Sequence, residues 1–104
     1  MFENYIKKIK LISDVTSELV SGRSICVPVE SSNIICWHYS PFSKNLSVLF
    51  GADRKKHTTY KYQNVGLDVV FKLLLAESVG KTINKEVIGK FDFTKFNDKE
   101  VVLS

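Results

Sequence analysis

The sequence predicts an α+β fold, in which a small antiparallel sheet of three or more strands is packed by one main helix. A further helix is expected at the N-terminus. Two observations carry this prediction. In the middle of the chain, apolar residues alternate with a period of two, which is typical of half-buried strands. Before and after this part they recur at three- and four-residue intervals, the period of an amphipathic helix.

The N-terminal helix is predicted over residues 2–20, because its apolar residues form one stripe. The stripe consists of Phe2, Tyr5, Ile6, Ile9, Ile12, Val15 and Leu19. Ser21 and Gly22 follow, and glycine readily adopts the left-handed conformation that ends a helix. The stripe either packs on the sheet or contacts a second copy of the chain, so a homo-oligomer is one of the two alternatives.

The strands are predicted in the next part of the chain. A short or edge strand surrounds Pro28, since proline donates no hydrogen bond to a ladder. Alternating residues then predict strands over 33–39, 46–50 and 58–65. A turn is expected at 40–45, and an extended basic loop at 51–57. Both faces of the 33–39 strand are apolar, which indicates that each is at least partly covered.

The main helix is predicted from Leu67 to Ser78, ending near Gly80. A shorter helical segment is expected after Thr82. Of the remaining residues, Phe93 and Phe96 are expected to return to the core. The segment 101–103 either adds an edge strand or stays loose at the terminus.

Three short blocks stand in a fixed order, namely Ser31-Ser32-Asn33-Ile34, Tyr60-Lys61-Tyr62 and Ala76-Glu77-Ser78-Val79-Gly80-Lys81, followed by Asn84, Ile88 and Phe91. In this order they resemble the KTSC family, small domains found at the C-terminus of some lysyl-tRNA synthetases and alone in bacterial and phage proteins. The resemblance implies a core over 31–91 within a single domain, with 1–22 and 92–104 as extensions. It implies no established reaction, although nucleic-acid binding has been suggested for such domains.

The net charge of +4 lies in one part of the chain. Residues 1–22 and residues 66–104 are each neutral overall, so the whole excess falls between Arg23 and Val65. A local basic excess near aromatic residues suits a phosphate-bearing partner. The alternative is a solvated hairpin, because charged side chains also keep loops soluble.

No catalytic group stands out. Gly80-Lys81-Thr82 is similar to the end of a phosphate-binding loop, but that motif needs a glycine where Leu75 stands. His38 and Cys36 alone do not make a four-coordinate metal site. Cys26 and Cys36 are expected to be buried free thiols. We therefore expect no enzyme activity, no metal and no cofactor.

A binding site is predicted from aromatic and basic residues together. Its members are Trp37, Arg54, Lys55, Lys56, Tyr60, Lys61 and Tyr62, with Ser78 and Lys81 as separate phosphate contacts. Rings stack on bases and basic side chains take up phosphates. The alternative is that the rings pack under the helix, since large aromatic residues dominate small cores.

Two functions follow from these features. The first is a non-catalytic module that binds nucleic acid or a nucleotide. The second is a small phage-type inhibitor of a host defence system, which acts on a host protein or sequesters a cyclic nucleotide signal. No stretch of about 18 apolar residues is present, so we expect no membrane insertion and a cytoplasmic location.

Overall fold

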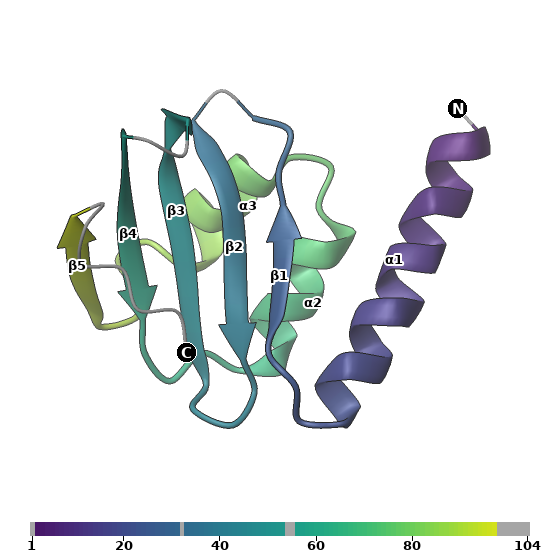
Figure 1. The fold of residues 1–104 in the computed structure, drawn as a ribbon, viewed down its shortest axis with the longest axis horizontal. Coiled ribbons are helices and arrows are strands. Elements are labelled where there is room, and N and C mark those ends of the chain that lie inside the picture. The colour runs from purple at the N-terminus through teal and green to yellow at the C-terminus, as the bar shows by residue number, and fades with distance from the viewer. Residues whose placement is uncertain (1, 32, 54–55, 98–104) are drawn as a thin grey trace.

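A five-stranded antiparallel sheet forms the centre of the molecule (Figure 1). The computed structural model describes residues 2–31, 33–53 and 56–97. Each strand pairs with the next one in the chain, so β1 and β5 form the two edges. The strands are β1 (Ile25–Pro28), β2 (Ile34–Ser40), β3 (Asn45–Asp53), β4 (Lys56–Tyr62) and β5 (Phe93–Asn97).

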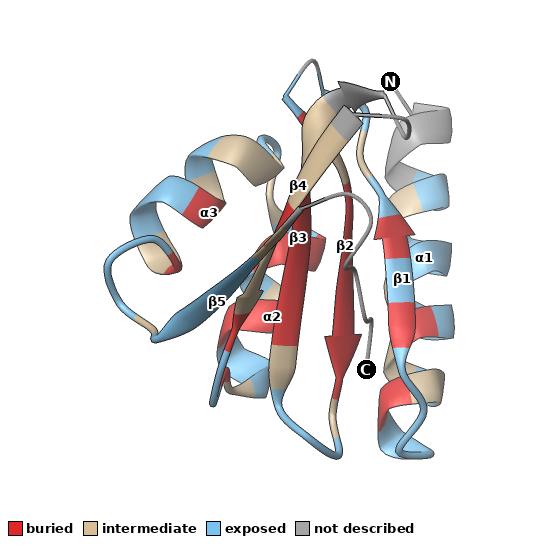
Figure 2. Ribbon diagram, turned by 60° about the vertical axis from the view of Figure 1, so that its left-hand side comes forward, coloured by how far each residue is buried: buried red, intermediate tan, exposed pale blue. Residues whose placement is uncertain are grey.

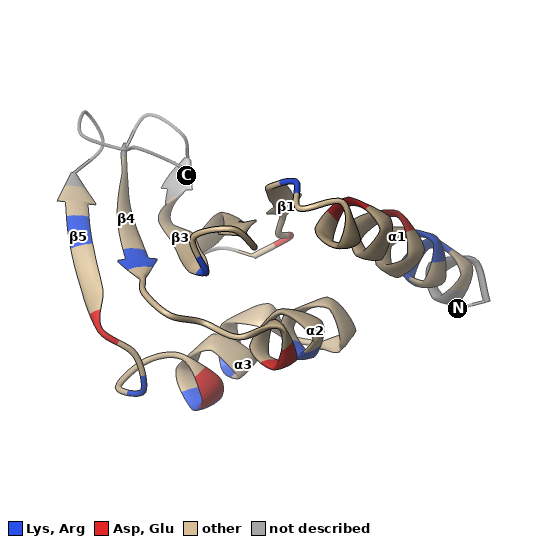
Figure 3. Ribbon diagram, turned by 90° about the horizontal axis from the view of Figure 1, so that it is seen from below, with Lys and Arg blue, Asp and Glu red and all other residues tan. Residues whose placement is uncertain are grey.

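The helices of the described residues are α1 (Phe2–Val20), α2 (Leu67–Leu75) and α3 (Val79–Glu86). Both α2 and α3 connect β4 to β5 and lie on one side of the sheet (Figure 3). Helix α1 stands beside the β1 edge (Figure 1). The predicted α+β class is confirmed, and the described sheet has five strands where three or more were expected.

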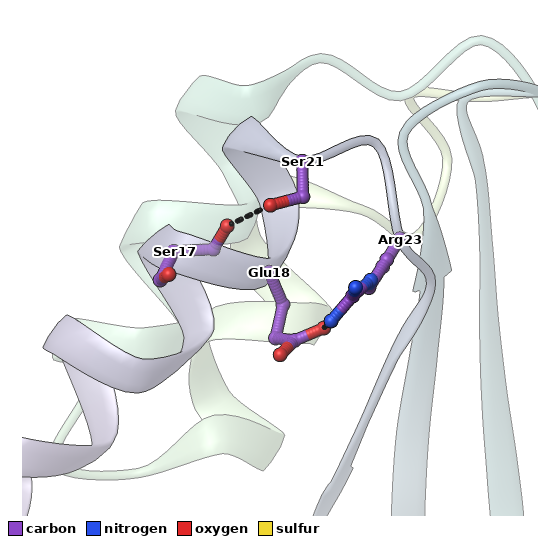
Figure 4. A network of polar contacts seen from close by, with 4 residues as sticks. All are labelled: Ser17, Glu18, Ser21 and Arg23. Atoms are coloured by element: carbon purple, nitrogen blue, oxygen red, sulfur yellow. Dashed lines mark hydrogen bonds and ion pairs between the residues drawn. The ribbon is translucent and has the colours of Figure 1, made fainter.

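Helix α1 packs through the C-terminal half of its apolar stripe. Val15 and Leu19 are buried, and the helix contacts both β1 and α2. The helix ends as predicted, since Gly22 has a φ of 80° in the left-handed region. At this end the Arg23 guanidinium lies 3.5 Å from the Glu18 carboxylate, and the Ser21 hydroxyl donates to the Ser17 carbonyl (Figure 4).

The core lies between the sheet and the helices, where alternation along the strands directs one set of side chains toward α2 and α3. Trp37, Val48 and Tyr60 stand opposite one another on β2, β3 and β4. They belong to the same apolar core as Leu73 of α2 and Ile83 of α3. Figure 2 shows the buried positions of β2, β3 and the inner side of α2 in red.

The predicted end of the main helix is wrong. Helix α2 stops at Leu75, and a new helix begins at Val79. Ser78 is the N-cap of α3, and its hydroxyl oxygen accepts a hydrogen bond from the Lys81 backbone N–H at 3.4 Å. Serine favours this position because its side chain offers the backbone a partner outside the helix. Gly80 therefore lies inside α3, without a left-handed φ, rather than ending α2.

The basic loop predicted over 51–57 is largely strand. Gly51 pairs with His57 and Asp53 with Lys56, with an irregular register between the two pairs. The strands therefore extend further into the hairpin than the alternating pattern indicated. The basic side chains of Arg54, Lys55 and Lys56 lie outside the described residues.

The strand β5 contains Phe93 and Phe96, the two residues that were expected to return to the core. Phe93 pairs with Tyr62, and Phe96 pairs with Thr59. Phe93 keeps 54% of its surface exposed, so it covers the edge of the core rather than entering it. The segment 101–103, for which an added strand was the alternative, lies outside the described residues.

The sheet face away from the helices is also buried in its centre. Cys36, Leu49 and Thr59 are buried there, as are His38 and Ser47. Both cysteines are free, as predicted, but Cys26 is exposed because it stands on the β1 edge.

Candidate functional site

An aromatic cavity of about 670 Å³ opens between the helix-covered face of the sheet and the end of α3. Its wall combines Phe50, Tyr60, Tyr62, Phe93, Asn33 and Ile88. Tyr60 and Tyr62 share a face because they are two residues apart on β4. Phe50 of β3 and Phe93 of β5 flank them from the neighbouring strands.

Tyr60 is the central ring of this cavity. Its ring centroid lies 5.4 Å from that of Phe50 in an edge-to-face arrangement and 5.3 Å from that of Phe93. Tyr62 stacks at 6.4 Å from Tyr60, with ring planes 23° apart. The Lys95 ammonium nitrogen is 5.9 Å from the Tyr60 centroid, within range of a cation–π contact. The ring pairs stabilise one another and hold the cavity wall in place.

The two tyrosines differ in exposure. Tyr62 is 4% exposed, whereas Tyr60 is half-buried. Burial, and secondly the neighbouring Tyr60, raises the pKa of the Tyr62 phenol above 10. The Tyr62 hydroxyl is therefore protonated at neutral pH and able to donate a hydrogen bond.

A second hollow, here called the helix cleft, measures about 790 Å³. It lies between the N-terminal half of α1, the connection from β1 to β2, and the junction of α2 with α3. Its wall includes Lys7, Asn33, Trp37, Ser78, Lys81 and Asn84. Asn33 lines the aromatic cavity as well, so the two hollows adjoin at this residue.

A contact between α1 and the end of α2 borders the helix cleft. The Lys8 ammonium donates to the Leu75 carbonyl at 2.8 Å and to the Ala76 carbonyl at 3.1 Å. These carbonyls belong to the end of α2, where a positive charge is favourable. One side chain of α1 thus fixes the helix against the junction that begins α3.

The structure divides the predicted site residues into separate groups. Tyr60 and Tyr62 come together in the aromatic cavity, and Ser78 and Lys81 come together in the helix cleft. Lys61 points to the opposite face of β4, where its charge acts on His38. Arg54, Lys55 and Lys56 cannot be placed, since their side chains are outside the described residues.

Of the two interpretations of Trp37, a stacking ring or a ring packed under the helices, the structure shows the packed one. Trp37 is 0% exposed because its ring is packed between the sheet and the helices. It forms part of the wall of the helix cleft, but its face is not available for stacking.

Sequence reasoning missed several members of the site. Phe50, Phe93 and Lys95 reach the aromatic cavity or its central ring only through strand pairing, and Lys7 reaches the helix cleft from α1. Asn33 stands in the first of the three sequence blocks, and this block was the signal that could have added Asn33 to the candidate site.

Among the described residues, no three His, Cys, Asp or Glu side chains gather as a metal site requires. In that part of the chain, every helix is too short or too polar to cross a bilayer.

Comparison with known proteins links the fold to a solved structure. No family model matches the chain, and no curated protein matches it. The crystal structure of a KTSC domain protein from Yersinia pestis is similar, with 27% sequence identity and a TM-score of 0.61. The match covers 70% of this chain and 97% of that chain. The fold is therefore KTSC-like.

Proposed function

We propose that this KTSC-like chain is a member of the KTSC family and a non-catalytic module that binds nucleic acid or a nucleotide. The base of the ligand occupies the aromatic cavity. The observation that carries the proposal is the group of four rings around this cavity, with Tyr60 at its centre and Lys95 over the Tyr60 ring.

The size and chemistry of the aromatic cavity suit a base. Its volume of about 670 Å³ lies within the range of small-molecule sites. A base that stacks on an aromatic side chain gains roughly 1–3 kcal/mol, and stacking tolerates any sequence because every base has a π-face. The Asn33 amide and the Tyr62 hydroxyl offer polar contacts to the base edge.

The charge of the chain supports an anionic ligand. The whole excess of +4 falls within residues 23–65, which include Arg54, Lys55 and Lys56 in the β3–β4 hairpin. A basic hairpin attached to the strand of Tyr60 would contact the backbone phosphates of an oligonucleotide. This arrangement supports nucleic acid as the ligand, and a single nucleotide is the alternative ligand class.

The first test compares the central ring with an exposed ring elsewhere. We expect Tyr60→Leu to weaken binding of a mixed-sequence single-stranded oligonucleotide about tenfold or more, because one stacking contact is lost. Phe42→Leu is the matched control, since Phe42 is 95% exposed in the turn between β2 and β3. Fluorescence anisotropy with a labelled oligonucleotide measures both. Equal affinity of folded Tyr60→Leu and the original chain would reject the aromatic cavity as the base site.

A second candidate function is inhibition of a protein partner, as a phage-type protein would do to a host defence component. The observation that favours it is the N-terminal half of α1, where Ile6 and Ile9 are 50% and 51% exposed. Large apolar side chains on an exposed helix face suit a protein contact. Replacing both by serine would abolish such a contact while oligonucleotide binding stays unchanged.

A further inference from the structure

We infer that the helix cleft binds the phosphate group of the same nucleotide whose base occupies the aromatic cavity. This inference rests on the function proposed above and names the second half of its ligand. It combines the start of α3, a buried indole and the position of Asn33 between the two hollows.

The start of α3 presents unpaired backbone donors to the helix cleft. The first hydrogen bond within the helix runs from the Thr82 N–H to the Ser78 carbonyl, at 3.1 Å. The Val79 and Gly80 N–H groups precede it, so they have no carbonyl partner within α3. Gly80 has no side chain to cover them, and a Cβ there would meet only the Ile34 side chain, at 3.7 Å. Such a helix start attracts anions.

Trp37 supplies an independent indication of a ligand. Its ring lines the helix cleft and is 0% exposed, yet its indole N–H has no hydrogen-bond partner among the described residues. Buried donors of this kind almost always have a partner in native structures. Because Trp37 is 0% exposed, an acceptor oxygen has to enter the wall of the cleft to reach this N–H, and phosphate offers several acceptor oxygens.

The charges of the helix cleft explain why a phosphate binds there with moderate strength. Lys7, Lys8 and Lys81 face Glu30 and Glu77, so three positive and two negative side chains leave an excess of one. Lys8 already donates to the carbonyls at the end of α2. Lys7 and Lys81 are therefore the phosphate contacts, and Glu77 opposes them from the residue before the N-cap.

The two hollows are close enough for one ligand. Asn33 lines both, and on the helix side Asn84 lines the cleft while Ile88 lines the aromatic cavity. Asn84 lies within α3, and Ile88 lies two residues beyond the end of this helix, four positions further along the chain. A base in one hollow and a phosphate in the other thus belong to a single nucleotide rather than to two molecules.

The test uses adenosine, AMP and inorganic phosphate with the full chain, by isothermal titration calorimetry at low salt. We expect AMP to bind at least tenfold more tightly than adenosine. Lys81→Gln should lose at least fivefold in AMP affinity while its adenosine affinity is unchanged. Glu77→Gln should gain about as much, because it removes a charge that opposes phosphate. Lys7→Gln, on a different helix, is the second variant in case Lys81→Gln does not fold.

The outcomes separate this inference from the proposed function. Equal affinities for adenosine and AMP, insensitive to Lys81 and Glu77, would overturn the phosphate site and leave the base site standing. If the original chain does not bind adenosine but binds phosphate in a way that depends on Lys81, the base site is removed and the phosphate site is kept. No binding of AMP or phosphate at all would overturn the inference.

Discussion

The Tyr39 hydroxyl donates a hydrogen bond of 2.6 Å to the backbone carbonyl of Val65. Tyr39 stands on β2 and Val65 on the connection from β4 to α2, and both are almost fully buried. The bond therefore joins the centre of the sheet to the segment that starts the helical layer. Burial, and secondly the charge of Asp68, raises the pKa of Tyr39, so the donor keeps its proton at neutral pH.

Removing this hydroxyl should destabilise the fold. Tyr39→Phe leaves the Val65 carbonyl buried without its partner, which costs roughly 1–3 kcal/mol of unfolding free energy. Urea denaturation followed by circular dichroism measures the change. Tyr60→Phe is the control, because the Tyr60 hydroxyl makes no hydrogen bond among the described residues. A change as large in Tyr60→Phe would show that the loss is not specific to the Val65 bond.

The contact between α1 and α2 depends on Lys8. Lys8→Met keeps the aliphatic stem and removes the donors to the Leu75 and Ala76 carbonyls. We expect a loss of about 1 kcal/mol and faster hydrogen exchange in α1, since the helix makes few other contacts. Lys10→Met, at an exposed position of the same helix, is the matched control. Indistinguishable exchange in the two variants would argue against a role of Lys8 in holding α1.

The stability of the fold should decrease in mild acid because of His38. Burial, and secondly the charge of Lys61, lowers the pKa of His38 below 6.5. In the unfolded chain this imidazole has a pKa near 6.5 and binds a proton that the folded state excludes. The free energy of unfolding therefore falls as pH drops below about 6.5, and His38 has no such effect above about pH 7.5.

His38→Gln removes this titration and should flatten the dependence of unfolding free energy on pH between about 7 and 5. Urea titrations at several pH values measure the slope. His57→Gln is the control and should keep the slope that His38 causes. An unchanged slope in His38→Gln would assign the acid sensitivity to other groups.

Two glycines should respond to alanine in opposite directions. Gly80 lies in α3 with room for a Cβ, so Gly80→Ala should raise the unfolding free energy by up to about 1 kcal/mol. Gly22 has a φ of 80° with open space around it, so Gly22→Ala should lower it by roughly 1 kcal/mol through backbone strain alone. Thermal melts of the two variants, compared with the original chain, measure both effects. Destabilisation by Gly80→Ala would mean that the start of α3 is more tightly constrained than its geometry indicates.

The basic hairpin should contribute to affinity through charge alone. Replacing Arg54, Lys55 and Lys56 together by alanine lowers the net charge from +4 to +1. If all three contact phosphates, the slope of log affinity against log salt for single-stranded oligonucleotides should fall by about 2. Anisotropy titrations over a range of salt concentrations measure the slope. An unchanged slope with unchanged affinity would exclude the hairpin from the nucleic-acid contact.

Local periodicity was sufficient to predict the N-terminal helix and the first strands. It failed at Ser78, because Leu75, Val79 and Ile83 continue a four-residue spacing through the break between α2 and α3. Only the preference of serine for the N-cap marks the boundary. Ser78 was instead expected at the end of the main helix, not at the start of the next one. A strand at Phe93 was missed for a similar reason, since Phe93 and Phe96 stand three residues apart and do not alternate.

The candidate site was harder to predict than the fold, since it is made by contacts between distant segments. Tyr60 and Tyr62 were recognised as neighbours from their spacing, but Phe93 joins them only through the pairing of β5 with β4. Asn33 meets both hollows because the β1–β2 connection, on which it stands, borders each of them. Trp37 was placed with the binding residues because its neighbours in the sequence do not reveal which aromatic rings the helices cover.

The position of β5 determines when the sheet can be completed during synthesis of the chain. The strands β1 to β4 form a continuous meander, whereas β5 pairs with β4 only after two helices have been made. The non-local pairing of Tyr62 with Phe93 is the slow kind of contact. A nascent chain thus exposes the edge of β4 before its last strand arrives, and until then its aromatic cavity lacks the wall that Phe93 provides.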